Sequence, residues 1–354
     1  MGGGVALKAI FCRNLKMKIQ FSKTYQDIIS LENLLTAWQE FICGKKRRKD
    51  VQEFERNLMT NLISLRKDLV AKTYQHSDYT AFNISDPKPR NIHKAKVRDR
   101  VLHHAIYRHL YPFFDKTFIA DSYSCRNSKG IHKALNRFRE FGRKVGKNNT
   151  RTAWVLKGDI KKFFASIDHK ILLEILGSYI TDKDILWLLQ MVIASFNFNE
   201  TDVGLPLGNL TSQLFCNVYM NEFDQFVKHE LKARYYIRYA DDFVFLSDSR
   251  GELIDLIPTI SEFLDRKLKL ALHPQKVFIK TLASGVDFLG WVHFPHHRVL
   301  RNVTKRRMFK GITKRPKNET LQSYLGLISH GDSYKVKQKL LNQYGLLIGE
   351  ELNL

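Results

Sequence analysis

Two adjacent aspartates, Asp241 and Asp242, join two apolar runs at residues 235–240 and 243–247. Both runs are rich in aromatic and β-branched residues, so they predict the two strands of a hairpin. Two carboxylates about 4 Å apart repel by roughly 4 kcal/mol at an effective dielectric near 20, so a cation or water must offset them. Tight hairpin turns favour Asn-Gly or Asp-Gly instead. We therefore interpret Asp241 and Asp242 as part of a functional site. The simpler alternative is that they lie in a solvent-exposed turn without a function.

A third aspartate, Asp159, ends another short apolar run, which begins at Trp154. Taken by itself, Asp159 fits the N-cap of a helix as well as a functional site. Beside Asp241 and Asp242 it would complete a cluster of three carboxylates. Carboxylate oxygens are ligands that Mg²⁺ prefers, and two such ions can activate an attacking 3′-hydroxyl and stabilise a leaving pyrophosphate. The three aspartates are thus candidate ligands of a nucleotidyl-transfer centre.

The charge balance of the chain indicates a polyanionic partner. Its 354 residues include 58 Lys or Arg and 35 Asp or Glu, which gives a formal net charge of +23 and a pI near 9.8. Nucleic acid is the simplest partner for such a surface. Charge alone does not separate a nucleic-acid enzyme from a ribosome-like binder or a membrane-surface protein. The 44% hydrophobic content supports a sizeable core and excludes a wholly disordered chain.

Cysteine and histidine usage gives no sign of a structural metal or a disulfide framework. The four cysteines are far apart and form no CxxC pair, and the 13 histidines lie at no metal-binding spacing. The longest apolar run, 185–196, is typical of a core helix rather than a membrane span. The N-terminus lacks the apolar segment of a signal peptide. We therefore expect a cytoplasmic protein of a reducing compartment, with no membrane partner.

Apolar spacing predicts the elements of the remaining chain. Helices are expected at 31–38, 54–69, 101–110, 129–141, 167–176, 185–196, 210–231, 253–268 and 321–328, and strands at 79–84 and 154–156. We expect Gly142 to end the helix at 129–141 and Pro258 to weaken the start of the helix at 253–268. Residues 298–317 contain nine Lys or Arg and no acid, so this stretch is strongly basic.

Four motifs follow one another in the order found in the palm of reverse transcriptases. They are Asp159 within Asp-Ile-x-x-Phe-Phe, Gly208-x-x-x-Ser212, Tyr239-Ala240-Asp241-Asp242 and Phe288-Leu289-Gly290. Two further stretches are similar to the fingers of those enzymes: Asp86-Pro87-Lys88-Pro89-Arg90 and Arg98-Asp99-Arg100. The chain therefore resembles the reverse transcriptase family from about residue 31 to its end.

The second motif narrows the resemblance. Group II intron and retroviral enzymes usually carry Gln-Gly-x-x-x-Ser-Pro, whereas this chain has Leu207 before Gly208 and Gln213 after Ser212. An aliphatic residue and a glutamine at these places resemble the reverse transcriptases of diversity-generating retroelements, which are part of the group II intron-like superfamily. The Val-Thr-Gly signature of retron enzymes is missing, because residues 302–305 are Asn-Val-Thr-Lys.

The resemblance implies an α+β, right-hand polymerase fold with fingers, an RRM-like palm of antiparallel sheet plus helices, and a helical thumb. We expect an N-terminal extension at 1–24, fingers with part of the palm at 25–150, the palm with the catalytic motifs at 151–295 and the thumb at 296–354. The implied activity is RNA-directed DNA synthesis from dNTPs, with template RNA and the RNA–cDNA duplex as partners. The narrower resemblance adds adenine-directed mutagenesis and a basic pentameric accessory protein, Avd.

The resemblance also implies roles for individual residues near the reaction. Asp159, Asp241 and Asp242 would hold two Mg²⁺ ions, for which Mn²⁺ can substitute, and the Ile160 carbonyl would be a further ligand. Lys276 would be a catalytic proton donor to pyrophosphate, and a solvated lysine fits the sequence nearly as well.

The remaining roles implied by the resemblance concern nucleotide and nucleic-acid binding. The dNTP-binding set is Lys88, Arg90, Phe164, Leu207, Gly208 and Gln213. Within it, the ring of Phe164 would exclude a 2′-hydroxyl, and Leu207 in place of a glutamine would loosen base selection. The primer grip would be Phe288, Leu289 and Gly290. Nucleic-acid binding by the thumb would involve Arg301, Lys305, Arg306 and Arg307.

Two other functions stay open on the sequence. One is a group II intron-like or defence-associated reverse transcriptase, which would share the motifs but copy faithfully. The other is a non-catalytic RNA-binding protein on a polymerase scaffold, which the intact Asp159, Asp241 and Asp242 disfavour.

Overall fold

The computed structural model describes residues 19–85, 89–196 and 202–351. The chain divides into two compact units, each assembled from two stretches of sequence. Unit 1 comprises Met1–Phe118 and Phe164–Asn221, and unit 2 comprises Ile119–Phe163 and Glu222–Leu354. The expected boundaries of fingers, palm and thumb were drawn from sequence motifs, whereas these two units are defined by packing. Those boundaries therefore stay predictions.

Unit 1 is helical apart from one two-stranded ribbon. Its helices are α2 (Tyr25–Ile29), α3 (Leu31–Ile42), α4 (Lys49–Arg56), α5 (Leu58–Val70), α6 (Val97–Phe114), α8 (His169–Gly177), α9 (Lys183–Ala194) and the first part of α10 (Leu210–Gln225). The ribbon pairs β1 (Thr80–Ile84) with β2 (Arg90–Lys94) in antiparallel register. Its core lies between α3 and α6, where Leu34, Phe41 and Ile106 are fully or almost fully buried.

Unit 2 contains two antiparallel sheets and the remaining helices. Its strands are β3 (Trp154–Asp159), β4 (Tyr236–Tyr239), β5 (Asp242–Ser247), β6 (Phe278–Thr281), β7 (Val286–Phe288), β8 (Trp291–His293) and β9 (Arg298–Leu300). Its helices are α7 (Ile131–Val145), α11 (Arg250–Leu268), α12 (Asn302–Lys314), α13 (Asn318–Ile328) and α14 (Tyr334–Glu351). The four-stranded sheet has the order β4-β5-β3-β6, and the three-stranded sheet has the order β7-β8-β9. The expected mixture of helices with an antiparallel sheet is confirmed.

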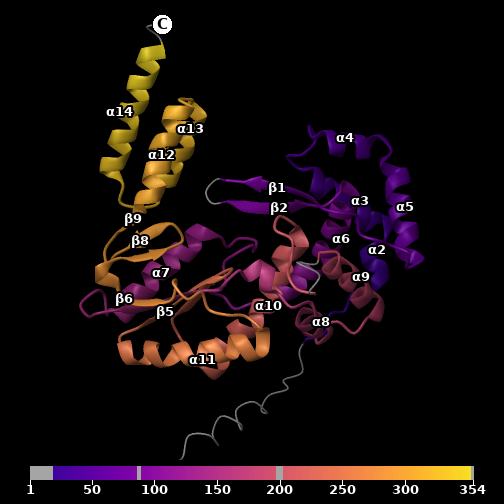
Figure 1. Cartoon of the computed structure of the whole chain (residues 1–354), viewed down its shortest axis with the longest axis horizontal. Helices are drawn as coiled ribbons and strands as arrows, with labels where there is room; N and C mark the ends of the chain where they lie inside the picture. The colour runs from indigo at the N-terminus through magenta and orange to yellow at the C-terminus, as the bar shows by residue number, and fades with distance from the viewer. Residues whose placement is uncertain (1–18, 86–88, 197–201, 352–354) are drawn as a thin grey trace, which may run out of the picture. The chain divides into compact units, whose positions relative to one another are not determined.

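The strand β5 is buried on both faces because successive side chains point to opposite sides of the sheet. On one side, Phe243 packs at 5.4 Å between ring centroids against Phe223, which in turn lies near Phe263 of α11. On the other side, Val244 and Leu246 join the apolar cluster that includes α7. The helices α11 and α7 therefore cover opposite faces of the sheet, and α12, α13 and α14 form a separate group of three helices (Figure 1).

Several predicted element bounds were wrong. The helix expected at 54–69 is two helices, because the backbone at Asn57 (φ −122°, ψ 38°) leaves the helical region between α4 and α5. No element was predicted around Ile92, but residues 90–94 form β2, because backbone pairing to β1 compensates for their polar sequence. Helix α6 also extends beyond the expected 101–110.

Two expected helix breakers lie inside helices. Gly142 does not end α7, which continues to Val145; a Cβ atom at Gly142 would come within 2.7 Å of Leu282, so the glycine allows close packing there. Pro258 does not delay α11, which starts at Arg250 because Ser249 caps it by accepting a hydrogen bond from the Glu252 amide. In both cases tertiary packing or a cap outweighs the local preference.

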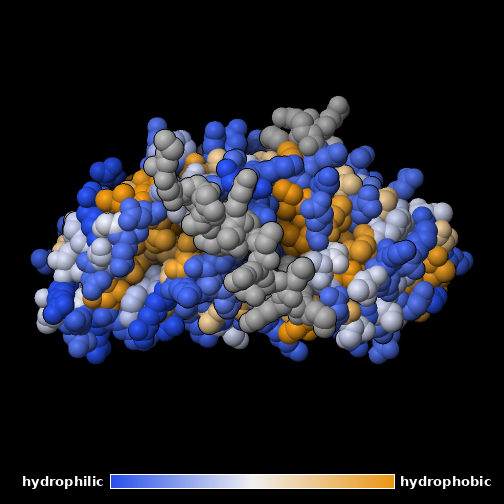
Figure 2. Space-filling model, turned by 90° about the horizontal axis from the view of Figure 1, so that it is seen from below, coloured by the Kyte–Doolittle hydropathy of each residue, from blue (hydrophilic) through white to orange (hydrophobic). Residues whose placement is uncertain are grey.

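Figure 2 shows the hydropathy of one face of the molecule. Hydrophilic residues cover most of the face drawn in Figure 2, and hydrophobic residues appear between them in smaller patches. Within residues 19–85, 89–196 and 202–351, no helix is both long enough and apolar enough to cross a membrane.

Candidate active site

The carboxylates of unit 2 meet where β3 ends and β5 begins. Asp159 is the last residue of β3, Asp242 is the first residue of β5, and the antiparallel register places the two directly opposite each other. Asp241 precedes Asp242 in the β4–β5 turn, where Ala240 has a left-handed backbone (φ 56°). The structure thus brings Asp159 together with Asp241 and Asp242, which lie more than 80 residues later in the sequence.

The three neighbouring carboxylates influence one another's ionisation, and the effect is seen at Asp241. Burial, together with the negative charges of Asp242 and Asp159, raises the pKa of Asp241 to about 6, while Lys276 acts in the opposite direction. A carboxyl group in such surroundings keeps its proton more readily than a solvated one. A bound cation would favour the ionised form of Asp241.

Two lysines lie against the carboxylates. The Lys276 Nζ donates to both carboxylate oxygens of Asp159, at 3.0 and 3.1 Å. The nearly buried Lys157 places its Nζ 3.3 Å from Oδ1 of Asp242. Lys276 therefore lies at the carboxylate cluster, and its role as proton donor stays a prediction.

The turn that carries Asp241 is supported by a buried ion pair that the sequence analysis missed. Arg238 and Asp224 are both fully buried, and the guanidinium donates to both carboxylate oxygens, at 2.8 and 2.6 Å. Tyr236 donates to the same carboxylate at 2.8 Å. A further donor of Arg238, Nη1, lies 3.1 Å from the Ala240 carbonyl. Arg238 thus links the helix α10 to the turn that carries Asp241.

A signal for this pair was present in the sequence. Tyr236 and Arg238 are two residues apart on a predicted strand, so both side chains point to the same face. A positive charge on a buried face requires a buried acid as partner. The identity of that acid, Asp224, depends on tertiary packing and could not be predicted from periodicity.

The carboxylate oxygens are chemically suitable ligands for a divalent cation, but they do not form a preorganised metal site. Among the described residues, no group of three or more His, Cys, Asp or Glu side chains is placed to hold a metal. Asp159 and Asp242 are each in contact with a lysine, but the contact between Lys157 and Oδ1 of Asp242 lacks hydrogen-bond geometry, so this buried oxygen makes no hydrogen bond among the residues described. Hard carboxylate oxygens with an unsatisfied acceptor fit Mg²⁺ or Mn²⁺. A metal would replace the lysine contacts.

The carbonyl of Ile160 is next to this cluster. Ile160 is buried and forms a bridge with Leu272, but the two backbone hydrogen bonds around it use the Asp159 carbonyl and the Lys161 amide. These bonds leave the Ile160 carbonyl out of the bridge. Its role as a metal ligand stays a prediction.

The expected primer-grip residues lie at the turn between β7 and β8. Phe288 is fully buried and packs against Phe138 with 5.4 Å between ring centroids. Leu289 (φ 50°) and Gly290 (φ 89°) form the turn. The Gly290 carbonyl accepts a hydrogen bond from the Arg301 amide at 3.3 Å. Phe288 therefore anchors the turn from inside, and the residues at the tip are the ones available for contact.

The basic residues expected to bind nucleic acid differ in their surroundings. The Arg301 guanidinium is paired with Asp287, so it holds the start of α12 to β7. Lys305 is half-buried, and Arg306 and Arg307 are exposed on the same helix. The last two are therefore better placed than Arg301 for an external partner.

The expected dNTP-binding residues belong to unit 1. Lys88 lies outside the described residues, and Arg90 is exposed at the first position of β2. Phe164 is half-buried in the short 3₁₀ turn Phe163–Ser166, and its carbonyl accepts from the Leu205 amide at 2.7 Å. Leu207 accepts a backbone hydrogen bond from His93 at 3.1 Å.

Two residues of this set line a pocket within unit 1. Gly208 and Gln213 share a pocket of about 370 Å³ with Ile92 and several cationic side chains. Gly208 has φ 107°, and a Cβ atom there would come within 2.9 Å of Ile92, so only glycine fits without movement. The buried Nδ2 of Asn209 has no hydrogen-bond partner in the described part of the chain. The pocket can thus accept a polar ligand of nucleotide size.

A reverse transcriptase (RNA-dependent DNA polymerase) family model matches residues 84–293, which is more than half of the chain. The chain belongs to the reverse transcriptase family. Membership makes it an RNA-directed DNA polymerase, and members of this family use divalent metal ions. The match spans the three aspartates and the primer-grip motif.

Several curated proteins are similar to this chain in sequence, all at low identity. Protein YkfC of Escherichia coli is 26% identical over 283 residues, which are 69% of this chain and 72% of that protein. The group II intron-encoded protein LtrA of Lactococcus lactis is 23% identical over 297 residues, or 65% of this chain and 47% of that protein. The putative COX1/OXI3 intron 2 protein of Saccharomyces cerevisiae is 22% identical over 199 residues, or 39% of this chain and 23% of that protein. This reverse transcriptase thus spans half or less of its intron-encoded relatives.

Among solved structures, apo telomerase of Candida tropicalis, truncated from its C-terminal domain, aligns with a TM-score of 0.48 and 13% identity. The alignment covers 69% of this chain and 60% of the telomerase chain.

Proposed function

We propose that this reverse transcriptase copies a retroelement RNA into cDNA at Asp159, Asp241 and Asp242, within a right-hand fold of fingers, palm and thumb. The observation that supports this most directly is the register of β3 and β5, which sets Asp159 opposite Asp242 beside the Asp241 turn. Such a cluster of carboxylates at a sheet edge is suited to nucleotidyl transfer.

The three aspartates would hold two Mg²⁺ ions, with Mn²⁺ able to substitute and the Ile160 carbonyl as a further ligand. Bound there, the ions would activate the 3′-hydroxyl of the primer and stabilise the leaving pyrophosphate. Lys276, at 3.0 Å from Asp159, would be released from that carboxylate and donate a proton to pyrophosphate.

The other expected residues would bind substrate and duplex. Lys88 and Arg90 would hold the triphosphate, and Phe164 would exclude ribonucleotides by contact with a 2′-hydroxyl. Leu207, Gly208 and Gln213 would contact the nascent pair. Phe288, Leu289 and Gly290 would place the primer end. Arg306 and Arg307, with Lys305 and Arg301, would contact the phosphates of the RNA–cDNA duplex.

We further propose that the enzyme belongs to a diversity-generating retroelement and misincorporates opposite template adenines, with Avd as its accessory protein. The residues that favour this are Leu207 before Gly208 and Gln213 after Ser212. A second candidate, a group II intron-like enzyme that copies faithfully, is favoured by the intron-encoded relatives. The two candidates predict different products from the same template.

The test is Mg²⁺-dependent dNTP incorporation on a primed RNA that contains adenines, with product sequencing and with or without Avd and cognate RNA. We expect synthesis by the wild type and a loss of roughly 10²- to 10³-fold or more in Asp242→Asn, since a charge that stabilises the transition state is removed. Asp255→Asn, an exposed carboxylate on α11, is the matched control and should retain activity.

Each outcome of this test assigns a function. Errors concentrated opposite adenine support the diversity-generating enzyme, and faithful products support the intron-like one. Equal yield and equal start sites with and without Avd would remove that accessory protein from the proposal. RNA binding without synthesis by the wild type, under all conditions, would reject the polymerase and leave a binding scaffold.

A further inference from the structure

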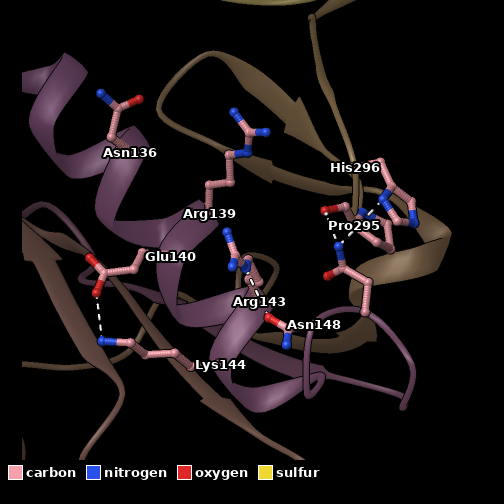
Figure 3. Close-up of a pocket in the computed structure, with 9 residues that line it drawn as sticks. Asn136, Arg139, Glu140, Arg143, Lys144, Asn148, Pro295 and His296 are labelled. Atoms are coloured by element: carbon pink, nitrogen blue, oxygen red, sulfur yellow. Dashed lines mark hydrogen bonds and ion pairs between the residues drawn. The ribbon is translucent and has the colours of Figure 1, made fainter.

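A groove on unit 2 is lined by one face of α7, by the loop that follows this helix, and by the turn between β8 and β9. We call it the α7 groove; its volume is about 1000 Å³. Figure 3 shows Arg139, Arg143 and Lys144 extending from the helix, with Asn148 and His296 on the other elements. The groove is distinct from the catalytic aspartates and from the residues expected to bind dNTP.

The spacing of residues along α7 places its arginines on the face that lines the groove. Its apolar residues, such as Leu135 and Phe138, are buried in the core of unit 2. Asn136, Arg139 and Arg143 recur at i, i+3 and i+7, so they share a different face of the helix. A helix with this division has one face for the core and one for a charged partner.

The groove is positively charged after its internal pairs are considered. Glu140 is the single acid among the described residues of the lining. It accepts from Lys144 at 2.6 Å and from Arg137, which lies outside the lining, at 2.7 Å. Arg143 donates to the neutral Asn148 at 2.9 Å, so its charge is not compensated. Arg139 makes no hydrogen bond or ion pair with the residues that the structure describes. Two guanidinium charges are therefore left for an anion.

Arg298, a half-buried arginine beside the groove, also lacks compensation. Arg298 donates to Asn136, which lines the groove, at 3.1 Å and to the His330 carbonyl at 2.5 Å. Its Nη1 is buried without a hydrogen-bond partner among the described residues. Burial and the nearby charge of Arg139 both lower the pKa of Arg298. A bound anion would relieve the repulsion between these two arginines.

The walls of the groove are held in place before any ligand binds. Asn149 donates to the Pro295 carbonyl at 3.0 Å, which ties the loop to the β8–β9 turn. Asn148 and Asn149 both have left-handed backbones (φ 58° and 67°), a conformation that asparagine adopts more readily than most residues. A fixed site loses little conformational entropy on binding.

The groove lies at the end of the sheet away from the aspartates. The loop that lines it leads into the N-terminal end of β3 at Trp154, and Asp159 is at the C-terminal end of the same strand. Five residue steps of extended chain separate these ends by roughly 17 Å. A ligand in the groove is therefore not the primer end or the incoming nucleotide.

We propose that the α7 groove binds backbone phosphates of a segment of the template RNA other than the segment being copied. Arginines and asparagines donate to phosphate oxygens, and Arg does so with two donors at once. Among the described residues that line the groove, Pro295 alone is apolar, so this lining lacks the buried apolar anchors of a protein interface. Phosphate contact adds affinity without sequence preference, which suits an anchor for a long RNA.

This inference rests on the reverse transcriptase activity proposed above, because that activity supplies the RNA. The test compares the full-length wild type with Arg139→Gln/Arg143→Gln and with Arg139→Gln alone. The control, Arg250→Gln/Arg266→Gln, removes the same charge from α11 of unit 2. For each protein, affinity for a long structured RNA is measured against salt concentration, and primer extension is measured on a short RNA–DNA duplex.

We expect the groove double variant to lose about tenfold or more in affinity for the long RNA, because charge-assisted hydrogen bonds are removed. Its slope of log affinity against log salt should be smaller by about 2, one phosphate contact for each arginine. Arg139→Gln should lose about half of this slope and melt at the wild-type temperature, since Arg139 holds no structural partner. Extension of the short duplex should stay at the wild-type rate in all variants.

Several results would overturn the inference. Unchanged RNA affinity in the groove variant, or an equal loss in the α11 control, would show that the groove contributes nothing beyond general charge. Unchanged RNA affinity with lost binding of a polyglutamate peptide would assign the groove to an acidic protein segment. Absence of extension by the wild type would reject the polymerase activity, and the RNA-affinity comparison would still decide the groove.

Discussion

Two antiparallel hairpins of the protein, β4–β5 and β1–β2, differ in how they are held. In β4–β5, the residues from Phe243 to Leu246 and from Tyr236 to Arg238 are all buried. In β1–β2, all five residues of β1 are exposed and β2 is exposed or half-buried. An isolated two-stranded ribbon is marginally stable in water, so packing rather than backbone pairing holds a hairpin rigidly. The first hairpin can therefore position catalytic groups, and the second can present side chains such as Arg90 to an external ligand.

The turns of the two hairpins reinforce this difference. The β4–β5 turn is attached to the core because Arg238 donates to the Ala240 carbonyl and pairs with buried Asp224. Asp241 and Asp242 follow directly, so their positions depend on a buried network. The network also explains how a turn with unfavourable local chemistry persists. The comparison predicts that substitutions in β4–β5 have large effects and that substitutions in β1–β2 have small effects on stability.

The largest effect is expected for Asp241→Asn, which keeps the shape of the side chain and removes its charge. Synthesis should fall by roughly 10²- to 10³-fold or more, since the carboxylate is proposed as a metal ligand. The melting temperature should stay the same or rise, because repulsion from Asp242 and Asp159 is relieved. Primer extension and thermal melting on the same preparation check this. Full activity in Asp241→Asn would exclude it from the catalytic set.

The next largest effect is expected for Arg238→Met. It leaves the Asp224 carboxylate buried and unpaired, which costs about 3–5 kcal/mol in the free energy of unfolding. Denaturant titration measures that free energy. The double variant Arg238→Met/Asp224→Leu should recover part of the loss, because a buried ion pair can be replaced by apolar packing. Equal losses in the single and double variants would show that the pair is not what supports the turn.

The pH dependence of stability tests the charge cluster itself. The raised pKa of Asp241, about 6, means that the folded protein binds this proton more tightly than the unfolded chain does. The free energy of unfolding should therefore fall as pH rises from about 4 to about 6, by roughly 1–2 kcal/mol after solvent screening is allowed for. Metal-free wild type and Asp241→Asn are compared by denaturant titration across this range. The wild type should show a downward slope that the variant lacks, and equal slopes would contradict the interpretation.

The two hairpins also show what sequence could and could not predict. The strands of β4–β5 were predicted because their apolar and aromatic residues signal burial, and the two aspartates between them marked the site. The strand β2 was missed because residues such as Arg90 and Lys94 carry no apolar pattern, and its pairing with β1 is a matter of backbone hydrogen bonds.

The site was predictable to the extent that its residues lie in ordered motifs. Asp159 could be assigned to the same cluster as Asp242 through its place at a strand end. The residues that support the cluster could not be predicted in this way. Lys157 and Asp224 lie in no recognisable motif, and their contacts arise only from strand register and tertiary packing. The α7 groove likewise depends on a turn and a loop 146 residues apart, which Asn149 and Pro295 join.

The smallest effect is expected for Ile84→Ala in β1. Ile84 is 37% exposed, so its truncation should change the free energy of unfolding by less than about 0.5 kcal/mol. The matched change in the other hairpin, Ile237→Ala, removes a fully buried side chain of β4 and should cost about 2–5 kcal/mol. Denaturant titration of both variants gives the comparison directly. Equal losses would mean that β1–β2 is packed against the rest of the protein in solution, and its proposed role in presenting Arg90 to the nucleotide would then have to be abandoned.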